Sequence, residues 1–248
     1  MSIFKIFGKG NEKVNFPIGE LMKTDMHSHI LPGIDDGATD VEMSIQLMQG
    51  MYDAGIRKFV ATPHVMADIH RNTPQSIQVA YDELKVALQA HPHLQDVRYA
   101  AEFMLDEQYE DKLKAKEILN VFGDHVLVET PILNRPFNIE SLIFITETEG
   151  FTPILAHPER YMYLFRKPEE YKKLKDRGCL FQLNVLSLTG YYGKMEKEAA
   201  VWLIEQNMID FLGSDMHHKR HLMNFHKYNI DRKVAKILEK SNFMNHRI

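Results

Sequence analysis

The sequence has 248 residues, 44% of them hydrophobic, which is enough chain for one large domain. Its formal net charge of −4 provides no basic surface for nucleic acid, and no run of arginines with interleaved aromatics occurs. The single cysteine, Cys179, excludes an internal disulfide framework. No apolar run reaches the roughly 18 residues of a membrane span, and the N-terminus lacks the apolar stretch of a secretory signal. We therefore expect a cytoplasmic protein that does not bind nucleic acid.

The first twenty residues differ from the rest of the chain in pattern. They carry a few apolar residues interrupted by lysines, which could touch a membrane surface or a partner. We predict that residues 1–20 form a flexible arm and that residues 21–248 form a single domain.

Strand and helix patterns alternate along the rest of the chain. The predicted strands are residues 24–30, 57–62, 97–101, 125–129, 152–157, 180–185 and 209–215. The predicted helices are residues 39–55, 73–90, 107–119, 138–148, 168–177, 194–206 and 232–240. Such alternation favours a parallel sheet, and closing the sheet into a barrel would bury strands that are apolar on both faces. The predicted class is α/β.

Residues 23–37 hold the densest group of ionisable side chains. Its members are Asp25, His27, His29, Asp35 and Asp36. Because side chains at i and i+2 of a strand point the same way, His27 and His29 can bind one ion together. The Pro-Gly and Asp-Gly steps that follow turn the chain, so that a loop carboxylate can return over this ion. The pattern predicts a metal site.

Most of the predicted strands carry a histidine or an acid at or just past the C-terminal end. These residues are His27, His29, His64, Glu102, Glu129, His157, Asp215 and His217. In a parallel barrel, the C-terminal ends of the strands carry the active site. Acids within helical patterns are interpreted as solvent-exposed, whereas the roles of His70, His218, His221 and His226 are left open.

Several motifs together resemble the PHP (polymerase and histidinol phosphatase) superfamily. They are Asp25-Met-His-Ser-His29, Gly33-Ile-Asp-Asp-Gly37, Thr62-Pro-His64, Ala101-Glu102, Ala156-His-Pro-Glu-Arg160 and Gly213-Ser-Asp-Met-His217. Within that superfamily, they are most similar to bacterial manganese-dependent protein-tyrosine phosphatases of capsule and exopolysaccharide loci. The resemblance spans residues 23–220 and implies a distorted, TIM-like (β/α)7 barrel, the PHP fold, with three metal ions at its rim.

The resemblance also implies a set of ligands. They are His27, His29, Glu102 and Asp215 for a first ion, with Glu102 bridging; Glu102, Glu129 and His157 for a second; and Asp36, His64 and His217 for a third. Imidazole and carboxylate ligands suit Mn, Fe or Zn, and we expect Mn. Three divalent ions, four carboxylates and a bridging hydroxide leave a small positive charge, which favours an anionic substrate.

The implied reaction is hydrolysis of a phosphate monoester by a metal-bridging hydroxide. Arg160, three residues after His157, is predicted to contact the non-bridging oxygens. The family places another phosphate-contacting arginine after the last strand, and Arg220 is our candidate for it. The phenolate of tyrosine leaves with a pKa of about 10 and needs little acid catalysis. The resemblance implies that the substrate is a phosphotyrosine protein. It further implies that this protein is a bacterial tyrosine autokinase that controls polysaccharide export.

Two alternatives remain open, and one is excluded. A PHP phosphoesterase for a small phosphometabolite such as histidinol phosphate would use the same metal site. An inactive, metal-stabilised binding module would retain the ligands without turnover. A cysteine-dependent phosphatase requires an arginine six positions after the cysteine, where this chain has Val185 after Cys179.

Overall fold

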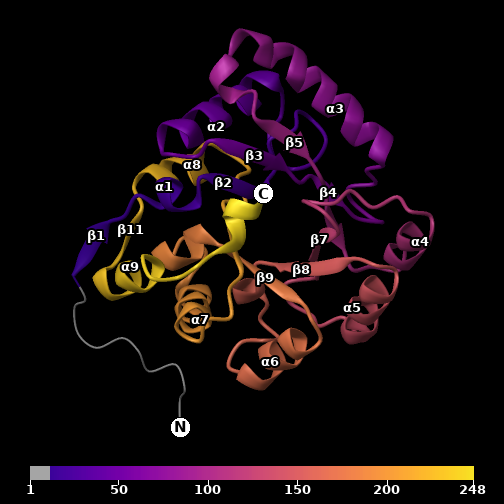
Figure 1. Ribbon diagram of the computed structural model, residues 1–248, viewed down its shortest axis with the longest axis vertical. Coiled ribbons are helices and arrows are strands. Elements are labelled where there is room, and N and C mark those ends of the chain that lie inside the picture. Colours follow the sequence, from indigo (N-terminus) through magenta and orange to yellow (C-terminus); the bar gives the residue numbers. More distant parts are fainter. Residues whose placement is uncertain (1–11) are drawn as a thin grey trace.

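The computed structural model describes residues 12–248 as a mixed α/β structure (Figure 1). In Figure 1 the helices surround the strands, and the yellow C-terminal segment lies near the middle of the view. Two parallel sheets hold most of the strands, in the orders β2-β3-β5 and β10-β9-β8-β7-β6-β4. The predicted α/β class with parallel strands is confirmed.

Each predicted strand is present, within a few residues of its predicted bounds. The three-stranded sheet contains β2 (Thr24–Ser28), β3 (Lys58–Ala61) and β5 (Val97–Tyr99). The six-stranded sheet contains β4 (His64–Val65), β6 (Glu102–Met104), β7 (His125–Glu129), β8 (Thr152–Ala156), β9 (Leu180–Asn184) and β10 (Phe211–Gly213).

The two parallel sheets are joined at both of their edges, by the chain itself on one side and by hydrogen bonds on the other. On one side, β3 passes into β4 through Pro63, whose missing N–H interrupts the ladder. The backbone N–H of Glu102 donates to the carbonyl of Pro63, at 3.0 Å, within the β4-β6 pair, and the chain likewise runs directly from β5 into β6. On the other side, the N–H of Asp215 donates to the carbonyl of His27, at 2.8 Å, and Ser28 bridges Met216 in parallel. The C-terminal ends of β2 and β10 therefore lie side by side.

The helices cover the outside of the strands. They are α1 (Ile18–Met22), α2 (Val41–Asp53), α3 (Pro74–Ala87), α4 (Tyr109–Lys114), α5 (Ile139–Thr148), α6 (Pro168–Asp176), α7 (Lys194–Glu205), α8 (Lys219–His226) and α9 (Arg232–Leu238). Helix α2 is capped by Asp40, whose side chain accepts from the N–H of Met43 at 2.8 Å. Helices α1 and α8 were not predicted.

Helix α4 is much shorter than the predicted helix over residues 107–119. It is capped at Ala115, and the next residue, Lys116, has a φ of +58°, in the left-handed region. Its first turn carries two acids, and its last turn two lysines, as the helix dipole favours. The prediction overextended a charged pattern beyond the residue that ends the helix.

The predicted N-terminal arm is wrong for residues 12–20, whereas residues 1–11 lie outside the described residues. Strand β1 (Lys13–Asn15) pairs antiparallel with β11 (Asn229–Asp231), more than 200 positions away. Phe16 and Ile18 are only 6% and 1% exposed and pack in the main core. Residues 12–20 are therefore part of the fold.

The amino ends of β2 and β10 are closed by the C-terminal turn η5 (Met244–Arg247). Asn245 of this turn is 3% exposed, and its amide donates to the carbonyls of Thr24 and Leu212, at 2.9 and 2.7 Å. Its Oδ1 accepts from the N–H of Leu212, at 2.9 Å. A buried polar side chain here has all of its hydrogen bonds satisfied by the backbone.

Candidate metal centre and active site

The structure brings together all nine side chains that were predicted as metal ligands. His64 and Glu102 are the first residues of β4 and β6, which continue β3 and β5, and the others lie at the C-terminal ends of strands or in the loops that follow. The nine residues are His27, His29, Asp36, His64, Glu102, Glu129, His157, Asp215 and His217. Their nitrogen and carboxylate atoms form overlapping groups whose members lie within 4.8 Å of one another. Parallel strands place residues that are far apart in the sequence at one edge.

The most deeply buried group surrounds His27 and His29. Their Nε2 atoms lie 3.2 Å apart. The Oδ1 atom of Asp215 is 3.3 Å from each of these nitrogens. The Oε2 atom of Glu102 lies 3.2 Å from the first and 3.4 Å from the second. His27, His29 and Glu102 thus form one group of mutually close ligand atoms, and Asp215 forms another with His27 and His157. Imidazole nitrogen and carboxylate oxygen in such groups suit a divalent cation.

Glu102 also faces the second group through its other oxygen. Its Oε1 lies 3.0 Å from Nε2 of His157, and Glu129 Oε2 lies 3.8 Å from the same nitrogen. His64 approaches from the other side, with Nδ1 2.8 Å from Glu129 Oε1 and 3.1 Å from Glu102 Oε2. The two oxygens of Glu102 therefore face different histidines, Oε1 facing His157 and Oε2 facing His27, His29 and His64.

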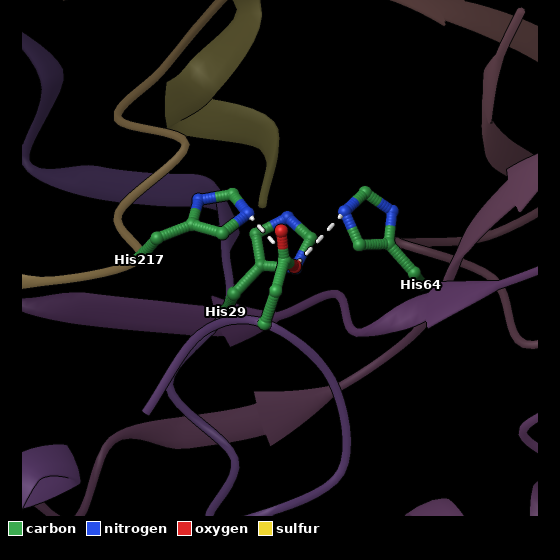
Figure 2. Close-up of side chains that lie close together, drawn as sticks. His29, His64 and His217 are labelled. Carbon is green, nitrogen blue, oxygen red and sulfur yellow. Dashed lines mark ion pairs between the residues drawn. The ribbon is translucent and has the colours of Figure 1, made fainter. Parts of the chain in front are cut away.

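The third group lies at the open edge of the cluster. Figure 2 shows the rings of His29, His64 and His217 turned toward one another, with dashed lines from two of them to a carboxylate. That carboxylate is Asp36, whose Oδ1 is 3.5 Å from His64 Nε2 and 3.4 Å from His217 Nε2. The Asp36 side chain is 61% exposed, so this group faces solvent.

Several buried atoms of the cluster have no hydrogen bond, although they have close neighbours. Within the described part of the chain, these include His64 Nδ1, Glu102 Oε2 and Glu129 Oε1. A buried polar atom without a hydrogen bond is costly and rare in folded proteins. Atoms that are close together but not aligned for hydrogen bonding are the arrangement expected of ligands directed at a shared ion. The residues present therefore fit divalent cations.

The charges of the cluster support the same conclusion. Burial and the neighbouring His29 lower the pKa of His64, but the carboxylates of Glu102 and Glu129 outweigh them and raise it to about 10. Burial would raise the pKa of Glu102 and of Asp215, yet the nearby histidines hold both well below the usual range. The pKa values of His27 and His29 are raised as well, so without a metal these two and His64 favour the protonated form, whose protons a cation would displace.

Asp35 orients the ring of His29. The residue is part of the Gly33–Gly37 motif, but no role was predicted for it. Its Oδ2 accepts from Nδ1 of His29, at 2.7 Å, which leaves Nε2 facing the cluster. Its Oδ1 accepts from the N–H of Gly37, at 2.9 Å. Burial would raise the pKa of Asp35, but His29 and this N–H lower it to about 2. A Cβ on Gly37 would lie 2.1 Å from the carbonyl of His29, so the tight loop requires glycine.

A cavity of about 440 Å³ opens onto the cluster. Arg160 lines it, with NH1 3.0 Å from Asp215 Oδ2 and the guanidinium carbon 4.5 Å from the ring centre of Tyr192. The other wall is largely apolar and consists of Met66, Ile69, Met104, Pro131 and Ile132. The cavity therefore combines a charged floor with an apolar wall.

The structure does not bring Arg220 to this cavity. Arg220 is exposed on α8, and its guanidinium carbon lies 5.6 Å from the ring centre of Tyr191. Of the histidines left open, His218 and His221 line the cavity, and His221 Nδ1 accepts from the N–H of His217 at 3.2 Å. His70 stacks on His64 with ring centres 5.4 Å apart. His226 is exposed in the last turn of α8.

Three polar residues beside the cluster were missed or left undecided by sequence reasoning. Gln182 and Asn184 are fully buried on β9 and contact His27 and Asp215. Glu159 is 3% exposed and accepts from the Asn184 N–H and the Ser187 hydroxyl. Burial raises its pKa to about 7. The alternation of Gln182 and Asn184 with Phe181 and Leu183 on a buried strand was the signal available.

The fold and the site define an α/β protein with a candidate metal centre of histidines and carboxylates, beside an arginine-lined cavity. Comparison with known proteins identifies the family. The chain belongs to the capsular polysaccharide synthesis CpsB/CapC family, whose model matches residues 23–241.

Two named tyrosine-protein phosphatases resemble most of the chain. The tyrosine-protein phosphatase YwqE of Bacillus subtilis is 32% identical over 203 residues, 82% of this chain and 80% of YwqE. The tyrosine-protein phosphatase CpsB of Streptococcus agalactiae is 30% identical over 200 residues, 78% of this chain and 82% of CpsB.

A solved structure is also similar. It comes from a study of YwqE from B. subtilis and CpsB from Streptococcus pneumoniae, described as metal-dependent tyrosine phosphatases. The TM-score is 0.76 at 30% sequence identity, covering 88% of this chain and 86% of the solved one. Among residues 12–248, no helix has both the length and the apolar character needed to cross a membrane.

Proposed function

We propose that this protein is a metal-dependent phosphoric monoester hydrolase that removes phosphate from phosphotyrosine in a protein. The observation that carries the proposal is the convergence of nine histidine and carboxylate side chains beneath a cavity that Arg160 lines. The tyrosine phosphatases among its relatives, 30% and 32% identical, support the same reaction. The substrate we propose is a bacterial tyrosine kinase of a capsule or exopolysaccharide system, dephosphorylated in the cytoplasm.

We further propose that the centre holds three divalent ions, with manganese as the physiological metal. All nine ligands offer imidazole nitrogen or carboxylate oxygen, a set that suits Mn, Fe or Zn. When bound, such ions supply an activated water and neutralise charge on the phosphoryl group. Asp35 holds His29 in the orientation that such binding requires.

The architecture that we propose for this centre is a distorted barrel of seven strand units, the PHP fold. In this description β3 and β4 count as one interrupted strand, as do β5 and β6. The hydrogen bonds between the segments after β2 and β10 would close the ring. A closed parallel ring leaves no open edge and gathers the strand ends at one rim.

The chain's own residues fit an aryl phosphate. Arg160 is held at the cavity by the carboxylate of Asp215 and the ring of Tyr192, and its fork of N–H donors matches phosphoryl oxygens. The apolar wall of Met66, Ile69 and Ile132 suits the tyrosine ring. Ile69 is 74% exposed and Ile132 36%, so the wall reaches the molecular surface, where a protein segment can enter.

The test is a comparison of turnover after manganese loading. Phosphotyrosine peptides, phosphoserine peptides and a panel of phosphometabolites that includes histidinol phosphate are measured side by side. We expect the highest kcat/KM on phosphotyrosine peptides, because the phenolate needs less acid assistance to leave than an alkoxide does. Preference for one small metabolite would instead indicate a general PHP phosphoesterase. Absence of turnover on every substrate, with manganese bound, would indicate a binding module.

A further inference from the structure

Two amide side chains on β9 connect two of the predicted metal ligands through the interior. His27 Nδ1 lies 2.7 Å from Gln182 Oε1. Gln182 Nε2 donates to Asn184 Oδ1, at 3.0 Å, and Asn184 Nδ2 donates to Asp215 Oδ2, at 2.6 Å. Gln182 and Asn184 are both 0% exposed. Because they stand at i and i+2, both side chains lie on the same face of the strand.

The chemistry of these groups fixes the direction of every hydrogen bond. The Asp215 carboxylate can only accept, so the NH2 group of Asn184 must face it. Asn184 Oδ1 is then left as an acceptor for the NH2 group of Gln182. Gln182 Oε1 in turn can only accept, and its donor is the Nδ1–H of His27. The chain of bonds runs one way, from His27 to Asp215.

This direction leaves the reactive atoms of both ends facing the cluster. With its proton on Nδ1, neutral His27 presents the lone pair of Nε2, 3.2 Å from Glu102 Oε2. Asp215 Oδ2 accepts from Asn184 and Arg160, whereas its Oδ1 lies 3.3 Å from His27 Nε2. The two ends of the chain therefore direct one nitrogen and one oxygen to the same point.

We propose that Gln182 and Asn184 are positioning residues, a carboxamide relay that sets the tautomer of His27 and the orientation of Asp215 so that both bind one cation. This inference rests on the proposed metal centre. Neither amide contacts the cation in this role. Both act through the ligands that they hold, as outer hydrogen-bond partners do in other metal sites.

The surrounding packing is built around the relay. A Cβ on Gly213 of the neighbouring strand would lie 2.6 Å from Gln182 Nε2 and 2.8 Å from His27 Cβ, so only glycine leaves room for this contact. The backbone N–H of Asn184 donates to Glu159 Oε1, at 3.0 Å, which anchors the second amide. The relay thus occupies a space that both neighbouring elements leave for it.

The first test replaces Gln182 with methionine, which keeps the volume and removes both hydrogen bonds. We expect Gln182→Met to weaken Mn²⁺ binding at one site by about 10- to 100-fold, while the other sites change less. Affinity and stoichiometry are measured on metal-free protein by calorimetric titration with Mn²⁺ and by electron paramagnetic resonance of the free ion. Unchanged affinity at every site in folded Gln182→Met would overturn the relay.

A second variant separates the two halves of the relay. Asn184→Leu removes the bond to Asp215 but leaves His27 bonded to Gln182. In zinc-loaded protein, which is diamagnetic, nitrogen-15 spectra report the Nδ1–H of His27 directly. We expect this signal to persist in Asn184→Leu and to exchange faster with water in Gln182→Met. An equally protected signal in wild type and Gln182→Met would contradict the proposal.

The matched control is Asn245→Leu, at the opposite end of the strands. Asn245 is also a buried amide, with three hydrogen bonds to the backbone. This variant should unfold at a lower temperature and bind Mn²⁺ with wild-type affinity. If wild-type protein itself bound no divalent ion, the proposed metal centre would be wrong. If Asn245→Leu lost as much Mn²⁺ affinity as Gln182→Met, the effect of Gln182 would be one of general stability, and the positioning role would be wrong.

Discussion

The two ends of the parallel strands bury polar side chains in different ways. At the amino ends, Asn245 directs every hydrogen bond to the backbone of Thr24 and Leu212. At the carboxyl ends, nine ionisable side chains face one another, and buried atoms such as Glu102 Oε2 have no hydrogen bond. Asn245 is satisfied by the protein alone, whereas the cluster at the carboxyl ends is arranged for a ligand. Stability and function therefore occupy opposite ends of the same strands.

Removing the metal should have the largest effect. We expect excess chelator to abolish turnover and manganese to restore it better than magnesium, because the ligands are rich in imidazole. Replacing His27 and His29 together with alanine should lower kcat on the order of 1000-fold or more and remove at least one bound ion. Activity is measured on a chromogenic aryl phosphate, and metal content by mass spectrometry.

The matched control for the histidine pair is His91 and His93, which have the same spacing but lie in the turns after α3, away from the cluster. Their double replacement with alanine should leave both turnover and metal content unchanged. Full activity of wild-type protein in excess chelator would contradict a metal-dependent site at the carboxyl ends of the strands.

The two predicted arginines offer the next comparison. Arg160→Ala should lower kcat and kcat/KM together by roughly 30- to 1000-fold, about 2 to 4 kcal/mol, because its contact tightens in the transition state. Metal content should stay at the wild-type level, since an arginine is not a ligand. Arg220 does not line the cavity, so Arg220→Ala should change turnover less than threefold if it makes no contact with phosphate.

Steady-state kinetics of both arginine variants on one phosphotyrosine peptide show which arginine contacts the phosphate. A large loss of kcat in Arg220→Ala would mean that α8 moves its arginine to the substrate, as the sequence resemblance implies. Wild-type turnover in Arg160→Ala would remove Arg160 from the site.

The stability of the metal-free protein should depend on pH through the ionisable side chains at the carboxyl ends of the strands. The pKa of His64 is raised to about 10, so its contribution to stability is complete below its unfolded pKa of about 6.5 and is lost as the pH rises through 10. The pKa of Asp35 is lowered to about 2, so its contribution is present above about 4 and is lost as the pH falls through 2.

Urea unfolding of the metal-free protein at pH 6 and pH 8.5 measures the histidine effect. We expect the free energy of unfolding to fall by about 1 to 3 kcal/mol between these values. His64→Gln should reduce this dependence, and bound Mn²⁺ should do the same because the ion replaces the protons. A metal-free protein that is equally stable at both values would show that the cluster histidines are not protonated in the fold.

Local patterns predicted the strands and the gathering of the nine side chains, because parallel strands place their C-terminal ends at one edge. They did not reveal the pairing of β1 with β11, since three-residue strands more than 200 positions apart leave no periodic signal. The relay on β9 was missed because Gln182 and Asn184 carry no charge and were not sought as ligands or acids. Contacts between distant segments, such as that of Arg220 with Tyr191, likewise required the structure.

Cys179 should have the smallest effect on turnover, although it is the only cysteine in the sequence. Its side chain is 0% exposed, and burial raises the pKa of the thiol to about 12, so the nucleophilic thiolate does not form near neutral pH. We expect Cys179→Ser to keep kcat within about twofold and to lower stability by about 1 kcal/mol, because the hydroxyl replaces a buried apolar sulfur. Ellman's reagent should label no thiol in the native protein at pH 8 and one equivalent after unfolding. Rapid native labelling together with lost turnover in a folded Cys179→Ser protein would move the chemistry away from the strand ends and to the thiol.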